Sequence, residues 1–324
     1  MPQLTCSIII PFRGDPEALE YTLKSLTRQE LPSSYMRSKV ELVLVNDGSE
    51  IDLSRLMATT SHYFPITYIN FKKNVGRSLA RNAAITYAKH DIAIFMDADI
   101  VVKEDFLRQH LTWQSASDTA VVIGFRENIP IAEIRRFFLD AAKSNRISAP
   151  SPKADFRFRK FVPRSWEQEY PELPYEAFDT QYELMKNTNQ FKEFGKYRRV
   201  GVWHLPSMLL TCNASMRKEA VLRARGFDAR FHGWGMEDTH LGAKLIAYGY
   251  YIVPSISLTA YHVTTPSSES DKASKYDEFK ANVITYDNIL KEAFIEESDL
   301  DWAREAAELV NQFAGVHEYR PMRL

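Results

Sequence analysis

Apolar runs of strand length alternate with amphipathic segments through the first third of the chain. The runs with strand character are residues 5–12, 39–47, 65–71 and 91–96. Between them, residues 16–27 and 77–89 repeat apolar positions at the spacing of a helix. Strands that are apolar on both sides and separated by helices are typical of a parallel sheet that is covered on both faces. The pattern therefore predicts an α/β domain in this part of the chain.

The pattern changes after residue 124 and returns to alternating elements near residue 205. A helical segment leads into a stretch rich in proline, basic and aromatic residues, which is typical of an insert or second subdomain. The elements expected around it are a helix at 131–142, a strand at 205–216, a short helix at 217–225, a loop that becomes a helix at 233–250, one or two strands within 251–263, and helices at 272–294 and 301–313. These changes divide the chain into segments 1–124, 125–204, 205–265 and 266–324.

Composition and charge exclude several classes of protein. The 324 residues are 45% hydrophobic, and their net charge of −1 attracts neither nucleic acid nor an anionic membrane. No apolar run approaches the ~20 residues that span a bilayer, and the first residues lack the basic region of a signal peptide. Cys6 and Cys212 lie in apolar runs and are too few for a disulfide framework. We therefore expect a cytoplasmic protein with no transmembrane segment and no nucleic-acid partner.

Two aspartates follow directly on the apolar run 91–96. Asp97 and Asp99 are two residues apart, so in an extended chain both carboxylates project to the same side. Neighbouring carboxylates repel unless a cation offsets them, and hard oxygen ligands suit Mg²⁺ or Mn²⁺. The same pair also fits a solvated strand end, or the nucleophilic pair of haloacid-dehalogenase-type phosphatases. The phosphatase interpretation is disfavoured, because this motif follows three strands and continues with valine.

A third carboxylate ends another predicted strand at the same edge of the sheet. Asp47 closes the run 39–47, and in parallel sheets ligands bind beyond the carboxyl ends of the strands. Its carboxylate suits the base or ribose of a nucleotide, and equally the N-cap of a following helix. Arg77 and Arg81 are four residues apart, so they share a helix face that either reaches a diphosphate or stays solvated.

Four segments, taken in order, resemble those of a known family. SIIIPFRGD, VELVLVNDGS, NVGRSLARNAA and IFMDAD resemble the inverting family 2 glycosyltransferases of the GT-A fold. FHGWGMEDTHLGAKL is similar to the GWGxED segment of galactosyltransferase-like and chondroitin-polymerase-type enzymes. The resemblance implies an α/β, Rossmann-like fold with a mostly parallel central sheet flanked by helices. It also implies that 1–124 binds a nucleotide-sugar, 125–204 is an acceptor-side insert, 205–265 is the acceptor and catalytic half, and 266–324 adds C-terminal helices.

The resemblance assigns the donor side of the site to five residues. Pro11 and Asp47 would contact the donor, with Asp47 at the nucleotide base, and Arg81 would contact the base or the diphosphate. Asp97 would bind the ribose or the metal shell, and Asp99 would ligate Mn²⁺ or Mg²⁺ directly. The implied donor is a nucleotide-sugar, and we expect it to be UDP-linked.

The acceptor side falls in the second half of the chain. By resemblance, Asp238 would be the general base, Glu237 would hold sugar or acceptor hydroxyls, and His262 would be a further metal ligand. Taken alone, the two acids also fit the first turn of a helix, where the macrodipole favours them. Trp234, flanked by glycines, suits stacking on an acceptor ring or packing into the core. His240 is expected on a helix surface.

The chain also departs from the family pattern. Arg13 and Gly14 stand where the family commonly has Tyr or Arg followed by Asn, and the QxxRW motif of processive polysaccharide synthases is absent. We expect a metal-dependent, inverting glycosyltransferase with a glycan, peptide or small-molecule acceptor. A retaining enzyme of the same fold is the alternative, and a nucleotidyl- or phosphoryl-transferring enzyme is another, although residues 8–16 hold no glycine-rich phosphate loop. The basic and aromatic segment 156–166 fits either a polyanionic or peptide acceptor, or a surface insert.

Overall fold

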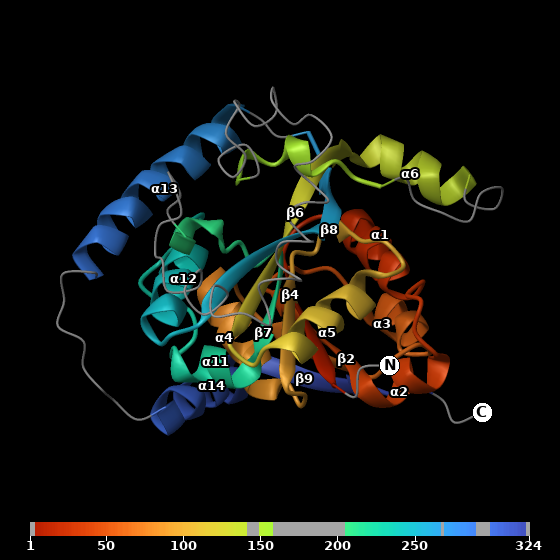
Figure 1. Cartoon of the computed structure of the whole chain (residues 1–324), viewed down its shortest axis with the longest axis horizontal. Coiled ribbons are helices and arrows are strands. Elements are labelled where there is room, and N and C mark those ends of the chain that lie inside the picture. The colour runs from red at the N-terminus through yellow and green to blue at the C-terminus, as the bar shows by residue number, and fades with distance from the viewer. Residues whose placement is uncertain (1–3, 141–148, 158–204, 267–268, 290–298, 322–324) are drawn as a thin grey trace.

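In the part of the chain that the structure describes, a nine-stranded sheet with helices on both faces forms the centre (Figure 1). The computed structural model describes residues 4–140, 149–157, 205–266, 269–289 and 299–321. The strands are β1 (Cys6–Phe12), β2 (Val40–Asp47), β3 (Ile66–Phe71), β4 (Ile92–Met96), β5 (Ile100–Val101), β6 (Ala120–Pro130), β7 (Asn213–Arg217), β8 (Tyr251–Thr264) and β9 (Ala314–Tyr319). The helices are α1 (Pro16–Leu26), α2 (Ser33–Lys39), α3 (Ser54–Thr60), α4 (Arg77–Tyr87), α5 (Phe106–Ala116), α6 (Ile131–Asp140), α11 (Lys218–Arg223), α12 (Glu237–Ala247), α13 (Glu269–Ile289) and α14 (Asp299–Phe313), with 3₁₀ turns η1 (Pro152–Ala154) and η2 (Leu205–Met208).

Successive residues of the central strands belong to two hydrophobic cores, one on each face of the sheet. Ile8 and Ile10 of β1 pack with residues of α1, α2, α3 and α5. Ile9, between them, packs with residues of α4, α11, α12 and α14. All three isoleucines are fully buried, as a strand covered on both faces requires. This arrangement confirms the α/β fold that the apolar runs predicted.

Six of the nine strands run in one direction. β3, β2, β1 and β4 are parallel neighbours, and β6 and β8 form a second parallel pair. β7 lies between β4 and β6 and is antiparallel to both, so the two parallel groups point the same way. β5 and β9 are antiparallel edge strands. The sheet is mostly parallel. β2 ends at Asp47 and β4 ends immediately before Asp97, so these predicted site residues lie at the same edge.

Strand β8 is irregular at its middle, and this irregularity determines the position of His262, a predicted metal ligand. Two steps along β6, from Gly124 to Arg126, correspond to five steps along β8, from Ser255 to Ala260. The second stretch of β8 continues beside β5, where Ile100 is paired with His262. The single strand β8 therefore spans the region expected to hold one or two strands, and it brings His262 next to the chain that follows Asp99.

The structure corrects two predicted elements. The strand expected at 205–216 begins only at Asn213, because the preceding residues form η2, where the Leu209 N–H donates to the Pro206 carbonyl (3.3 Å). The segment 266–324 was expected to be helical, but its residues 314–319 form β9 and extend the sheet beside β3. The apolar pattern missed β9 because this strand covers an edge of the sheet and is largely exposed.

Much of the predicted insert lies outside the described residues. This applies to 141–148 and 158–204, and so to most of the basic and aromatic segment 156–166. The division into four segments therefore stays a prediction. In the described part of the chain, no helix combines the length and apolarity that a membrane span needs.

Candidate active site

A buried arginine joins three of the predicted carboxylates. Arg81 of α4 is 2% exposed, and its Nη2 lies 3.2 Å from Asp97 Oδ1. Its Nη1 lies 3.1 Å from Glu237 Oε1 and 3.5 Å from Asp238 Oδ1. Asp97 follows β4, whereas Glu237 and Asp238 begin α12, so one guanidinium links the first and second halves of the chain. Removing one partner from such a buried network leaves the other charges uncompensated.

The carboxyl group of Asp238 is buried and binds its proton more tightly than an exposed aspartate. Burial raises the pKa of Asp238 to about 6, against the opposing charge of Arg81 and with the support of the Glu237 charge. Thr211 donates both its backbone N–H (3.0 Å) and its hydroxyl (2.6 Å) to this carboxylate. At Asp97, burial also opposes ionisation, but Arg81 and other nearby cations outweigh it and lower the pKa. Near neutral pH both groups are ionised, and Asp238 is the more basic.

Asp99 and His262 face each other across the pair β5–β8. His262 Nε2 lies 3.4 Å from Asp99 Oδ2, and the Val263 N–H donates to the Asp99 carbonyl (2.7 Å). His262 Nδ1 lies 2.9 Å from Asn128 Oδ1. An amide oxygen can only accept a hydrogen bond, so this contact requires a proton on Nδ1, and in the neutral ring Nε2 would be the nitrogen available to a metal ion.

These two side chains fit a divalent cation. Asp99 Oδ1 is a buried oxygen without a hydrogen-bond partner among the described residues, and it is a hard donor of the kind that Mg²⁺ and Mn²⁺ prefer. Over the same residues, no group of three His, Cys, Asp or Glu side chains gathers at one point. An ion held by Asp99 and His262 would therefore take its remaining ligands from substrate oxygens and water.

Asp47 fixes the loop that leads into α4. Its carboxylate accepts the N–H groups of Val75 (2.6 Å) and Gly76 (3.2 Å), and it is 5% exposed. Gly48 allows the close approach, because a Cβ at this position would lie 2.3 Å from the backbone of the same loop. Neither Asp47 nor Ser49 caps the next helix, which begins at Ser54 after Leu53. Pro11, partly exposed near the end of β1, lies at the same edge of the sheet, and both contacts with a donor stay predictions.

Helix α13 holds the loop that precedes α12 through hydrogen bonds and ring packing. Asn282 donates from Nδ2 to the carbonyl oxygens of His232 (2.8 Å) and Gly235 (2.9 Å). Trp234 is 39% exposed and lies beside Phe279, with 5.7 Å between ring centroids. Gly235 has φ +96°, and a Cβ there would lie 2.8 Å from the Phe279 ring. The glycines of this motif thus let α13 dock, while the indole stays partly accessible, and its contact with an acceptor stays a prediction.

The expectation for His240 is wrong. His240 is 5% exposed and packs between Phe231 and Tyr286, which come from the preceding loop and from α13. Burial lowers its pKa to about 4, so the ring is neutral near pH 7. The pattern on α12 indicated a surface position because it could not reveal that a later helix covers this side.

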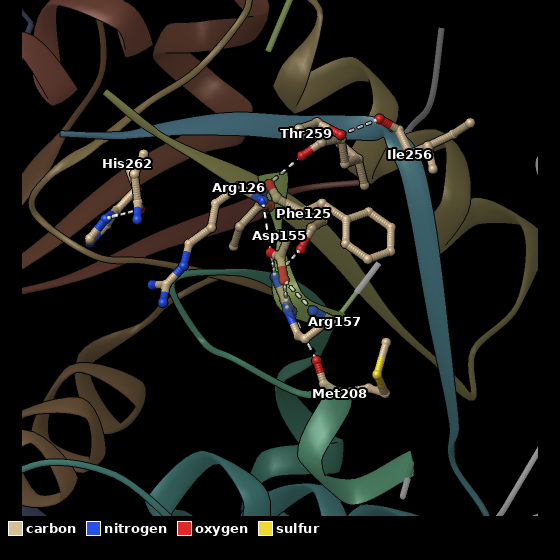
Figure 2. Close-up of polar contacts among 12 residues, drawn as sticks. Phe125, Arg126, Asp155, Arg157, Met208, Ile256, Thr259 and His262 are labelled. Atoms are coloured by element: carbon tan, nitrogen blue, oxygen red, sulfur yellow. Dashed lines mark hydrogen bonds and ion pairs between the residues drawn. The ribbon is translucent and has the colours of Figure 1, made fainter. Parts of the chain in front are cut away.

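Sequence reasoning missed several residues that support the site. Thr211 lay inside an expected strand, and Asn282 lies in a helix with no motif of its own. Asn128 and Arg126 alternate along β6 beside the second stretch of β8. In Figure 2, the Arg126 side chain extends away from the Asp155–Arg157 pair, on the side where His262 lies. The signal that could have found Arg126 is a charged residue directly after the apolar run 120–125, where no strand was predicted.

Comparison with known proteins gives matches over most of the chain. The model of glycosyl transferase family 2 matches residues 7–220, and that of the N-terminal domain of galactosyltransferase matches residues 203–265. The chain is 24% identical to the uncharacterized glycosyltransferase YfnE of Bacillus subtilis, over 88% of this chain and 71% of that protein. It is 25% identical to the hyaluronan synthase of Pasteurella multocida over 82% of this chain, but it spans only 25% of the length of that synthase.

Solved structures share the fold. The mannosyltransferase PcManGT of Pyrobaculum calidifontis, in complex with GDP-Man and Mn²⁺, superposes with a TM-score of 0.54 and 14% identity, over 95% of this chain and 71% of that one. TarS 1–349 of S. aureus, in complex with UDP-GlcNAc, gives 0.52 and 12% identity, over 95% and 72%. At these identities the likeness is one of architecture, and it confirms the GT-A fold that the sequence predicted.

Proposed function

The chain belongs to glycosyl transferase family 2, and on this premise we propose that it is a metal-dependent, inverting glycosyltransferase that uses a UDP-sugar. That it is a glycosyltransferase follows from the family. The metal, the stereochemistry, the nucleotide and the acceptor are the proposed part. The acceptor is a glycan, a peptide or a small molecule.

One observation carries the proposal: the candidate base is separate from the candidate metal ligands. Asp238 is bound by Arg81 and Thr211, whereas Asp99 lies beside His262. A general base works best when its pKa lies near the operating pH, and burial has raised the pKa of Asp238 to about 6. A single carboxylate outside the metal pair is what a one-step inverting displacement requires.

The reaction then has a defined flow of atoms and charge. The acceptor hydroxyl oxygen bonds to the anomeric carbon of the donor while the bond from that carbon to the diphosphate breaks. The hydroxyl proton passes to an Asp238 carboxylate oxygen, and the bond electrons leave with the nucleoside diphosphate. Glu237 shares Arg81 with Asp238, and Trp234 lies in the loop before α12; both are proposed to hold sugar and acceptor groups. Arg81, which is 2% exposed and pairs with carboxylates through both Nη atoms, is proposed to position Asp238.

Asp99 and His262 are proposed to hold Mn²⁺ or Mg²⁺, which when bound would neutralise charge on the leaving diphosphate. The likeness to a mannosyltransferase structure with Mn²⁺ supports a metal, and the likeness to TarS with UDP-GlcNAc supports a uridine nucleotide. Asp97, ionised and turned toward Arg81, is proposed to orient the ribose side of the donor. Pro11 and Asp47, at the ends of β1 and β2, are proposed to border the nucleotide.

The test is a panel of nucleotide-sugars with Mn²⁺, read by thermal shift for binding and by release of nucleoside diphosphate for turnover. Asp238→Asn is expected to lower turnover by about 10²- to 10⁴-fold while donor affinity stays near that of the wild type. Asp91→Asn, an exposed acid outside the site, is the matched control. Asp99→Asn should lose the response to Mn²⁺. If no nucleotide-sugar binds or is hydrolysed, the proposal is refuted, and a product of retained configuration would refute the inverting mechanism.

A further inference from the structure

Arg126 is a partly buried cation beside the candidate metal ligands, and its guanidinium has no role in the fold. It lies on β6, immediately after the irregularity opposite β8. Within the described ranges the guanidinium makes no hydrogen bond and no ion pair, unlike that of Arg157 nearby. Taking a guanidinium out of water without a partner is unfavourable, so a partly buried and unpaired arginine indicates a site for an anion.

The backbone of Arg126 is held rigidly even though its side chain is free. The Arg126 N–H donates to Asp155 Oδ2 (3.0 Å). Asp155 is itself fixed by Arg157, whose Nη2 lies 2.8 Å from the same oxygen, and both side chains are 1% exposed. Arg157 also donates to the carbonyl oxygens of Gly124 (2.8 Å) and Met208 (2.9 Å). Figure 2 shows this pair to the right of the Arg126 side chain. A fixed backbone under an unpaired cation is the arrangement of a preorganised binding group.

Strand geometry determines where the side chain points. Arg126 and Asn128 are two residues apart on β6 and so project to the same side of the sheet. Asn128 bonds His262 on that side (2.9 Å), and His262 is 3.4 Å from Asp99. Burial lowers the pKa of Arg126, but Cys212, Asp97, Asp155 and Asp99 outweigh this and raise it, so the guanidinium stays charged. Arg126 therefore faces the edge of the site where the metal ligands lie, without being neutralised there by either aspartate.

We propose that Arg126 binds the β-phosphate of the donor's diphosphate, the group that leaves in the reaction. The assignment rests on the proposed function, which places the diphosphate at Asp99 and His262. A guanidinium offers several N–H donors in a planar fork that matches phosphate oxygens. Its charge would hold the diphosphate in the ground state and would meet the negative charge that builds up on the leaving oxygen as the glycosidic bond breaks.

The experiment measures nucleotide affinity by calorimetry for the wild type and Arg126→Gln, with UDP and UMP as probes in Mn²⁺. UDP affinity is expected to fall roughly 10- to 100-fold in the variant, whereas UMP, which lacks the β-phosphate, should change less than about threefold. Repeating the UDP titration with EDTA in place of Mn²⁺ should preserve the difference, because the contact does not pass through the ion. Arg108→Gln, a half-exposed arginine of α5, is the matched control and should leave both affinities unchanged.

Each other outcome overturns the assignment. Unchanged UDP affinity would mean that Arg126 contacts another group, and a changed affinity for acceptor alone would move it to the acceptor side. Equal losses for UDP and UMP would indicate a structural role. If Arg126→Gln does not fold, Arg126→Lys takes its place, because it keeps the charge but loses the planar fork of N–H donors. Its affinity for UDP must then fall by less than the change expected for Arg126→Gln, and its affinity for UMP must stay unchanged. A wild type that binds no nucleoside diphosphate, with GDP as a second probe, would instead refute the proposed function.

Discussion

Replacement of Arg81 by methionine tests whether this buried cation sets the basicity of Asp238. The change removes the charge and keeps most of the side-chain volume. Arg81 Nη1 lies 3.5 Å from Asp238 Oδ1, and the arginine is 2% exposed. Two unit charges ~4 Å apart interact with roughly 4 kcal/mol at an effective dielectric constant near 20. Since about 1.4 kcal/mol corresponds to a tenfold change in the protonation equilibrium, the variant should need a pH about 2 to 3 units higher to ionise Asp238.

The assay is the rate of nucleoside diphosphate release at saturating donor, measured from about pH 5 to pH 10. In the wild type, the rate should fall below about pH 6, because burial has raised the pKa of Asp238 to about 6 and only the ionised form accepts a proton. In Arg81→Met, the pH below which the rate falls should be higher than in the wild type, and alkaline pH should restore much of the lost rate. Arg81→Lys should lie between them. Arg135→Met is the control: it removes a half-exposed cation paired with Glu17 and should not change the pH at which the rate falls.

The pH dependence of the unfolding free energy tests the effect of Arg81 on Asp238 independently of the rate. Because the pKa of Asp238 is raised above its ordinary value of 3.8, this group favours the folded state at acid pH, and that contribution is lost as the pH rises through about 6. Without Arg81, this loss should be larger and should extend to higher pH, as urea denaturation at several pH values would show. The reasoning is refuted if the rate of folded Arg81→Met still falls only below about pH 6, or if its stability deficit does not grow with pH.

Three further substitutions test the supports around the site. Arg157→Met should cost about 3–5 kcal/mol of unfolding free energy in urea, because Asp155 would remain buried without its partner, and a loss below ~1 kcal/mol would contradict this. Gly235→Ala should cost about 1–3 kcal/mol through its φ of +96° and the contact with Phe279, whereas Gly249→Ala has a similar φ but open space and should cost less. Asn282→Ala should cost about 1–3 kcal/mol of unfolding free energy, because it removes the hydrogen bonds to the loop before α12. It should also lower turnover with donor affinity retained, and an unchanged turnover would mean that the contact of α13 with this loop does not affect catalysis.

The apolar pattern of the sequence could predict where the site lies, because a parallel sheet places the ends of its strands together. Asp47 and Asp97 were predicted at one edge for this reason, and β2 and β4 do end there. The spacing of Arg77 and Arg81 could not show which of them is buried. That depends on α12, which begins 156 residues after Arg81 and supplies two of its three carboxylates. Contacts between remote segments, such as Thr211 with Asp238, leave no periodic signal in either segment.

The two arginines at the site differ in what surrounds them, and the difference determines their roles. Arg81 is fully buried and paired with three carboxylates, so moving it to a diphosphate would leave those acids uncompensated. Arg126 is only partly buried and unpaired among the described residues, so an incoming anion displaces no protein partner. The helix spacing left open whether Arg77 and Arg81 reach a diphosphate, and the family resemblance placed Arg81 at the base or the diphosphate. On charge balance in the folded protein we propose Arg126 for the diphosphate and Arg81 for positioning Asp238, the proposed base.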